Sequence, residues 1–242
     1  MIDEIKKLNH KIAISDRDKL WIQTEYPNIT ISSSKLSGEI CFQRTYNNIT
    51  LLDSCNIEIL LSHNKQSILP KVKCLDNKIE KIAKSLNLKM DQLHTNADGS
   101  FCLTVYPKEK SFFTNEQFNI QEFFTNLLEP YLYWICYYEK YKKAPWGEYS
   151  HGSLGIFEFI AEEDLNFRKI YRILKTNNIS LRKVLSLYRQ SKCLCGEKKS
   201  KTESKIRKCH NKAWIGIVKI KIALNQRLSI LPQKNQTTIS KV

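Results

Sequence analysis

Acidic side chains nearly disappear from the last third of this 242-residue chain. Residues 1–165 carry 19 Lys and Arg against 22 Asp and Glu, whereas residues 166–242 carry 20 Lys and Arg and only two acids. The net charge of +15 is therefore the sum of a slightly acidic part, at −3, and a strongly basic part, at +18. Such a step in composition indicates two domains, which we place at residues 1–165 and 166–242.

Composition and thiol content limit the class of protein. Apolar residues make up 42% of the chain, enough to bury a core, which excludes wholesale disorder. No apolar run approaches the roughly 18 residues that cross a bilayer, and the first residues show no apolar segment typical of a secretory signal. We therefore expect a cytoplasmic protein, in which the eight cysteines are core residues, metal ligands or nucleophiles before they are disulfides. Cys41, Cys55, Cys74 and Cys136 lie within strand or helix patterns, and we expect each of them to be a core residue.

Hydrophobic periodicity predicts an α+β protein. Helical spacing recurs at residues 2–12, 18–26, 78–86, 121–141, 152–163, 167–173, 181–188 and 213–224. Strand-like runs lie at 29–33, 39–46 and 49–61, the last with a turn near 53–56, and a short edge strand follows Pro70. Residues 87–110 are expected to form an ordered loop, Pro130 to kink the long helix, and residues 232–242 to be a flexible end.

The segment LHTNADGSFCLTVYP, residues 93–107, is the first candidate site. A thiolate is a good nucleophile and a good thioester leaving group, which suits Cys102 to acyl transfer. The amide of Asn96 can donate a hydrogen bond to the oxyanion of a tetrahedral intermediate, and His94 stands in the same loop. The alternative is that Cys102 is a buried core thiol, because free cysteine is among the most buried residue types.

The order of these motifs resembles that of ubiquitin-conjugating enzymes, which share the UBC fold. In that family a Pro-Pro-Lys-Val-like stretch precedes a His-Pro-Asn tripeptide, and a Gly-x-Ile-Cys-Leu segment carries the active-site cysteine. Residues 69–72 (LPKV), 94–96 (HTN) and 99–103 (GSFCL) stand in these places here. Over roughly residues 1–160, the resemblance implies an antiparallel sheet flanked by helices, a thioester on Cys102, an oxyanion contact from Asn96 and a loop-shaping role for His94.

Two departures from the eukaryotic pattern favour one branch of this family. Thr95 replaces the proline of the tripeptide, and the spacing from Asn96 to Cys102 is six residues, which is shorter than in the eukaryotic enzymes. In this shorter loop, and in the glycine-rich segment described next, the chain resembles the bacterial UBC-like proteins of short anti-phage CBASS operons. That resemblance implies a role in antiviral defence and a partner protein, a cGAS-like nucleotidyltransferase, whose C-terminal glycine is joined to the cysteine.

A glycine-rich segment, WGEYSHGSLGI at residues 146–156, follows the predicted long helix. Its glycines allow tight backbone geometry, and it resembles a stretch of the bacterial UBC-like proteins. His151 can serve Cys102 as a base or as a modulator of its pKa. The alternative is a packing turn whose histidine is hydrogen-bonded to the backbone, and the sequence leaves both open.

Four soft metal ligands lie within 18 residues of the basic domain: Cys193, Cys195, Cys209 and His210. Three thiolates and one imidazole complete a tetrahedral zinc set, which predicts a structural rather than a catalytic ion. The lysine-rich loop between them holds almost no apolar residue, so the metal would supply its folding free energy. The alternative is a coincidence of surface cysteines. The pattern is similar to the SEC-C motif, with a longer loop.

The basic domain is expected to attract polyanions. Trp214 is the only aromatic residue after Tyr188, so few aromatic side chains are present for bases to stack on. We therefore expect an acidic protein surface ahead of nucleic acid as the partner, and no membrane.

The sequence thus predicts a UBC-like antiparallel sheet flanked by helices, followed by a small basic helical zinc module. The predicted activity is that of a thioester-forming acyl transferase, with no soluble cofactor. Two alternatives stay open. One is a non-catalytic UBC-like scaffold whose zinc module binds protein or nucleic acid. The other is a cysteine hydrolase that uses Cys102 with His94 or His151.

Overall fold

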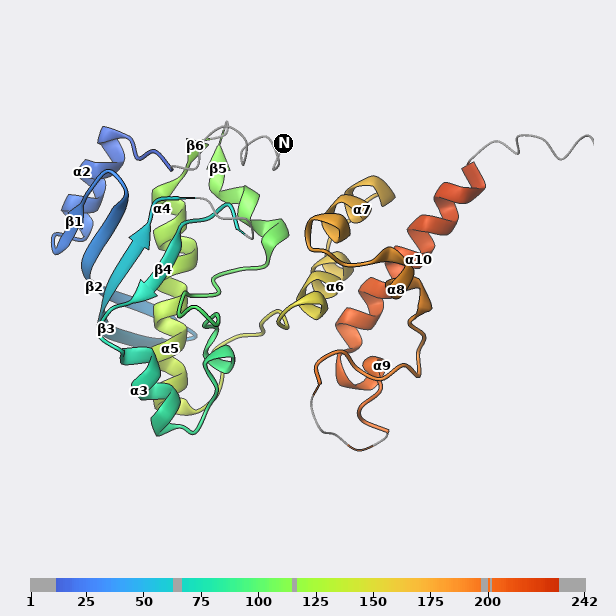
Figure 1. The fold of residues 1–242 in the computed structure, drawn as a ribbon. Helices are drawn as coiled ribbons and strands as arrows, with labels where there is room; N and C mark the ends of the chain where they lie inside the picture. The colour runs from blue at the N-terminus through green and yellow to red at the C-terminus, as the bar shows by residue number, and fades with distance from the viewer. Residues whose placement is uncertain (1–11, 63–66, 115–116, 197–199, 201, 231–242) are drawn as a thin grey trace, which may run out of the picture. The chain divides into compact units, whose positions relative to one another are not determined.

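The computed structural model describes residues 12–62, 67–114, 117–196, 200 and 202–230, and it divides the chain into two compact units (Figure 1). The first unit is Met1–Gly147 and the second is Glu148–Val242. The charge step near residue 165 therefore falls inside the second unit, after its first helix. Almost all of the predicted helix at residues 2–12 and the whole polar end at 232–242 lie outside the described residues.

A four-stranded antiparallel sheet forms the centre of the first unit, which establishes the predicted α+β class. Helix α2 (Asp16–Glu25) precedes it and begins at Ser15, whose Oγ accepts a hydrogen bond from the Asp18 N–H. The strands follow in chain order, and each pairs with the next: β1 (Ile29–Ile31), β2 (Lys35–Tyr46), β3 (Ile49–Leu60) and β4 (Lys71–Cys74). The predicted edge position of β4 is confirmed.

The turn predicted near residues 53–56 is wrong. Strand β3 continues through this segment, with Asp53 opposite Phe42 and Asn56 opposite Glu39 of β2. Asp, Ser and Asn are turn-forming residues by propensity, but here Ser54 Oγ donates to Glu39 of β2 and the Asn56 N–H donates to Asp76. The Lys78 ammonium binds Asp53. Tertiary partners therefore override the local preference.

The core of the first unit lies between the sheet and one long helical segment. Alternate residues of the two central strands are buried: Leu36, Ile40 and Phe42 in β2, and Leu51, Cys55, Ile57 and Ile59 in β3. Against them pack α4 (Ile120–Phe123), a π-helical turn η3 (Phe124–Leu128) and α5 (Glu129–Tyr141), of which α5 contacts both strands (Figure 1). The irregularity precedes Pro130, which stands in the first turn of α5, where its missing N–H costs least.

Short elements connect the sheet to this segment. They are α3 (Lys78–Ser85), the 3-10 helices η1 (Met90–Leu93) and η2 (Tyr106–Phe112), and the two-stranded β5 (Phe113–Thr114) and β6 (Gln117–Phe118). The predicted ordered loop at residues 87–110 therefore contains η1 and most of η2. It carries the candidate cysteine between them.

The second unit is helical in its described residues. It comprises α6 (Ser153–Glu162), α7 (Phe167–Thr176), α8 (Leu181–Ser186), α9 (Ile206–Cys209) and α10 (Asn211–Ile230). The backbones of α6 and α10 come close at Gly216, where an added Cβ would lie 1.8 Å from the carbonyl oxygen of Phe157. Ile217 and Ile220 of α10 are buried beside this contact. No helix among the described residues is long and apolar enough to cross a membrane.

Candidate functional site

The candidate nucleophile Cys102 ends a loop that is closed by backbone pairing. Its N–H donates to the carbonyl oxygen of His94 at 2.7 Å, and Thr95 and Phe101 form an antiparallel bridge just inside that contact. The Phe101 N–H also donates to the carbonyl oxygen of Val72 in β4, at 2.9 Å. The loop is thereby joined to the edge of the sheet, which fixes the backbone on the N-terminal side of Cys102.

Asn96 holds the turn of this loop. Its backbone N–H donates to the carbonyl oxygen of Ser100 at 2.7 Å, and its side-chain amide donates to Ser100 Oγ at 3.1 Å and to the carbonyl oxygen of Phe101 at 3.3 Å. Gly99 has a φ of 79°, a conformation that glycine adopts without strain. The amide of Asn96 is therefore engaged within the loop, one residue before the thiol.

An ion pair that no sequence motif indicates stabilises the same turn. Lys71 Nζ lies 2.5 Å from a carboxylate oxygen of Asp98, and the other oxygen of Asp98 accepts from the N–H and Oγ of Ser100. The Lys71 hydrogen bond, followed by those from Ser100, holds the pKa of Asp98 well below its ordinary value. Lys71 belongs to the LPKV motif, which the sequence shows. Its partner Asp98 lies 27 residues further along the chain, so no local pattern indicates the pair.

Aromatic side chains of helix α5 pack against the loop that carries Cys102. Phe101 stacks on Tyr131 with ring centroids 4.3 Å apart, and the His94 ring meets Trp134 edge-on at 5.0 Å. The Tyr131 hydroxyl donates to the carbonyl oxygen of Leu93 at 3.0 Å, and burial raises its pKa. Neither Tyr131 nor Trp134 was predicted, because only the fold brings the long helix under the loop.

The thiol of Cys102 is itself partly exposed. A partly exposed thiol on a fixed loop can reach an acyl carbon from outside, which a fully buried core thiol cannot. His151 belongs to the second unit, immediately before the N-cap of α6, so its action on Cys102 stays a prediction. Beside it, the N–H and Oγ of Ser150 donate hydrogen bonds to the buried carboxylate of Glu158. These bonds fix the backbone just before α6 begins.

The four predicted metal ligands come together in the second unit. Their ligand atoms all lie within 4.8 Å of one another, so the group could hold a metal ion. Cys195 Sγ lies 3.6 Å from Cys209 Sγ, and Cys193 Sγ lies 3.1 Å from His210 Nδ1. These separations approach the roughly 3.5–3.8 Å edges of a tetrahedron with zinc–ligand bonds of about 2.0–2.3 Å.

Backbone pairing brings the two ligand-bearing segments side by side. Lys192 and Lys205 form an antiparallel bridge, and the Cys193 N–H donates to the carbonyl oxygen of Ser204 at 2.6 Å. Cys209 ends α9, and His210 stands between α9 and α10. Burial, reinforced by hydrogen bonds with the neighbouring thiols, raises the pKa of Cys193 to about 12. A bound cation would reverse that effect, because it stabilises thiolates.

The segment that carries the predicted metal ligands also forms part of a basic pocket. It has a volume of about 240 Å³ and is lined by Arg189, Gln190, Lys205, Arg207 and Lys208. Four cationic side chains around one concavity favour an anionic group there. The two lining residues Arg207 and Lys208 directly precede the ligand Cys209, so an ion at the cluster would also fix this wall of the pocket.

No protein-family model matches the chain, and neither a curated protein nor a solved structure does. The resemblances to UBC-fold enzymes and to the SEC-C motif therefore rest on their motifs and on the order of the elements that carry them.

Proposed function

We propose that the chain is a ubiquitin-conjugating-like enzyme of bacterial anti-phage defence, acting in the cytoplasm. In this proposal Cys102 forms a thioester with the C-terminal glycine of a partner protein, a cGAS-like nucleotidyltransferase. The supporting observation is the position of the partly exposed Cys102 after a closed loop that is joined both to β4 and to α5. A helix, a four-stranded antiparallel sheet, the HTN and cysteine motifs and a long helix follow one another in the order that the resemblance implies.

The chemistry needs two displacements. In the first, the Cys102 thiolate attacks the activated carbonyl carbon of the terminal glycine, and the activating group leaves as the thioester bond forms. In the second, a lysine amine attacks the thioester, and the Cys102 thiolate leaves as the amide bond forms. In the structure the side-chain amide of Asn96 donates hydrogen bonds within its own loop. Rotation of this amide so that one N–H group faces the developing oxyanion would stabilise the second transition state.

A chemically activated probe tests the first step without an activating enzyme. We would incubate the full chain with a fluorescent peptide ending in glycine, presented as its C-terminal mercaptoethanesulfonate thioester. Cys102 is expected to displace the small thiol and to retain the peptide in an adduct that dithiothreitol removes. Cys102→Ala should abolish the adduct, while Cys41→Ala, which removes an exposed thiol on β2, should leave it unchanged. An adduct that persists in Cys102→Ala would contradict the mechanism.

The role of Asn96 separates the conjugating enzyme from the two alternatives. Asn96→Ala should leave the adduct forming but slow its transfer to added lysine by about 10²-fold, the effect of losing one oxyanion donor. If the loop contacts of Asn96 were its whole role, adduct formation and transfer would fall together. A scaffold would form no adduct above the level of unfolded protein, and a hydrolase would release free peptide acid with turnover.

We further propose that Cys193, Cys195, Cys209 and His210 bind a structural zinc ion in the second unit. Three thiolates and an imidazole form a complete donor set for zinc, and the four ligand atoms all lie within 4.8 Å of one another. Native mass spectrometry of the protein should show one zinc per chain from this set, and Cys209→Ser should lose it. Iron in place of zinc would change the proposed ion.

We propose the basic pocket as the place where an acidic surface of the partner docks. Four cations line it, and the adjoining ligand set would keep it in shape. Arg207→Glu should weaken binding to the partner and reduce the loss of affinity with rising salt. Competition by duplex DNA at the same salt concentration would favour nucleic acid instead.

A further inference from the structure

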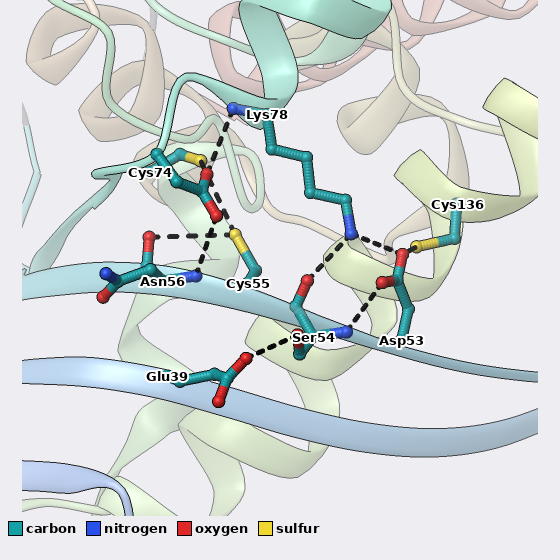
Figure 2. A network of polar contacts seen from close by, with 9 residues as sticks. Glu39, Asp53, Ser54, Cys55, Asn56, Cys74, Lys78 and Cys136 are labelled. Atoms are coloured by element: carbon teal, nitrogen blue, oxygen red, sulfur yellow. Dashed lines mark hydrogen bonds and ion pairs between the residues drawn. The ribbon is translucent and has the colours of Figure 1, made fainter.

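Two thiols other than the candidate nucleophile face each other in the first unit. Cys55 lies on β3 and Cys74 ends β4, and Cys74 pairs in register with Ile57. Because side chains two residues apart on a strand share a face, Cys55 and Cys74 project to the same side of the sheet. Their sulfur atoms lie 3.6 Å apart, in van der Waals contact, as Figure 2 shows. A disulfide bond of about 2.0 Å requires only a small further approach.

The two thiols differ in access and in acidity. Cys55 is 2% exposed, whereas Cys74 is partly exposed at the end of the edge strand. The hydrogen bond from Cys55 lowers the pKa of Cys74, and backbone N–H groups of Asp76 and Ile79 act in the same direction against burial and the Asp76 carboxylate. The same sulfur–sulfur contact, with burial, raises the pKa of Cys55. The outer sulfur is therefore the better nucleophile and the inner one its proton donor.

Polar partners hold both cysteines in this arrangement. Cys74 donates to Asp76 Oδ1 at 2.8 Å, and that carboxylate also accepts from the backbone N–H groups of Lys78 and Asn56. On the other side, the Lys78 ammonium binds Asp53 and the carbonyl oxygen of Ser54 (Figure 2). The pair therefore sits among polar and charged groups, unlike a thiol packed solely among apolar side chains.

We propose that Cys55 and Cys74 form a redox-active thiol pair that hydroperoxides oxidise to a disulfide and a dithiol reductant restores. Cys74 loses its proton and its thiolate attacks the peroxide, so that an S–O bond forms, the O–O bond breaks, and the alkoxide leaves and takes up a proton. The Cys55 sulfur then attacks the Cys74 sulfenic acid. The S–S bond forms, the S–O bond breaks, and hydroxide leaves with the Cys55 proton as water.

The balance of this reaction is two thiols and one hydroperoxide giving one disulfide, one alcohol and one water. Two electrons pass from the sulfur pair to the peroxide. Reduction reverses the sulfur change, because a dithiol gives up two electrons and two protons and becomes a disulfide itself. The site needs neither the metal cluster nor Cys102, so it is independent of the proposed function.

A third thiol provides a control inside the same network. Cys136 Sγ donates to Asp53 Oδ2 at 2.6 Å and faces the same Lys78, but this contact is to a carboxylate, not to a sulfur (Figure 2). Burial, followed by the Asp53 hydrogen bond, raises its pKa. Cys136 is therefore expected to stay reduced under conditions that oxidise Cys74.

Peptide mapping tests the proposal, because trypsin places each thiol of the first unit in a different peptide. The peptides are residues 36–44 for Cys41, 45–65 for Cys55, 74–78 for Cys74, 90–108 for Cys102 and 111–140 for Cys136. The reduced full chain is treated with a small excess of hydrogen peroxide, blocked with N-ethylmaleimide in denaturant and digested without reductant. We expect peptides 45–65 and 74–78 to appear cross-linked, and dithiothreitol to release them.

Single substitutions identify the order of events. Cys55→Ser should abolish the cross-link and leave Cys74 as a sulfenic acid that dimedone captures, while Cys74→Ser should leave Cys55 reduced. Cys136→Ser is the matched control and should cross-link like the wild type. Because Cys55→Ser alters a buried site, the partly exposed Cys74→Ser serves as the second, conservative variant.

Two results would overturn the proposal. One is a wild-type digest in which both peptides carry N-ethylmaleimide after peroxide treatment. The other is protection of both thiols from N-ethylmaleimide in the native, untreated chain that a chelator removes. That second result would make the pair a metal site.

Discussion

The first unit of this chain and the ligand-bearing segment of the second differ in how many apolar side chains they bury. In the first, the large side chains of a sheet and a long helix form one apolar core, which includes Phe123, Phe124 and Tyr133. In the second, α6 and α10 pack closely, but the segment that carries the ligands, residues 193–210, contributes only Cys193 and Ile206 to the buried apolar residues described. Apolar burial can stabilise the first unit alone, whereas we expect the ligand segment to need the proposed zinc for its stability.

Removing the proposed zinc should have the largest effect. Structural zinc supplies about 10–16 kcal/mol in small zinc-binding peptides, which matches or exceeds the whole stability of an ordinary domain. Chelation, or Cys209→Ser, should therefore abolish hydrogen-exchange protection in residues 193–210 and weaken it in α10. The first unit should keep its protection.

Cys41→Ser is the matched control, because it removes an exposed thiol from the first unit. Unchanged protection of residues 193–210 after complete chelation, with metal loss checked by native mass spectrometry, would contradict the comparison. It would mean that helix packing alone holds the ligand segment.

Gly216→Ala should have the next largest effect, confined to the second unit. The new methyl group would meet the backbone of Phe157, which cannot move aside like a flexible side chain, so α6 and α10 must separate. We expect a loss of about 2–3 kcal/mol, since overpacking outweighs the roughly 1 kcal/mol that alanine gains in helix propensity. Hydrogen exchange of α6 and α10 measures it.

Two other glycines serve as reference points for that change. Gly147→Ala meets open space, so it should leave hydrogen exchange unaltered. Gly38→Ala would bring a methyl group within 2.0 Å of the Asn28 carbonyl oxygen, at a φ of 144°, and should destabilise the first unit instead. Equal hydrogen exchange in Gly216→Ala and Gly147→Ala would refute the close packing of α6 and α10.

Local patterns predicted the elements better than they predicted their partners. Alternation revealed β2 and β3, and the four predicted metal ligands lie together because they are close in the chain. Asp53 was assigned to a turn because its partner Lys78 is 25 residues away. Cys41 was expected in the core, which is wrong: it alternates with buried Ile40 and Phe42 and is exposed, a signal the strand pattern already contained.

The same limit applies to the candidate site. His94, Asn96 and Cys102 form one loop, so sequence spacing alone brought them together. The supporting groups Asp98 and Tyr131 act through pairings with β4 and through α5, which no local pattern shows. Cys55 and Cys74 were expected as separate core residues, and only the β3–β4 register makes them neighbours.

Breaking a partly buried ion pair of the first unit should have a moderate effect. Glu129 accepts from Arg44 at 2.8 Å and from the Tyr26 hydroxyl, and burial followed by that hydrogen bond raises the pKa of Tyr26. Glu129→Ala leaves both partners without this acceptor and should cost about 2 kcal/mol. Exposed Glu139→Ala on the same helix should change stability by less than about 0.5 kcal/mol.

Urea unfolding followed by tryptophan fluorescence measures this difference. Three of the four tryptophans, Trp21, Trp134 and Trp146, lie in the first unit, so the signal reports mainly on that unit. Equal midpoints for the two variants would show that the pair contributes nothing beyond a surface charge.

The smallest effect is expected where charge supports the candidate site. Asp98→Asn removes the ion pair with Lys71, and because the carboxylate is substantially exposed, solvent screening limits the loss to less than about 1 kcal/mol. The folded state lowers the pKa of Asp98, so its contribution is present above the unfolded value of about 4 and is lost as the pH falls through the folded value. The difference between wild type and variant in urea midpoint should be constant above about pH 5 and vanish in strong acid. A difference that exceeds the effect of Glu129→Ala would mean that charge, not backbone pairing to β4, holds the cysteine loop. The loop would then depend on electrostatic attraction, as we propose for the ligand segment of the second unit.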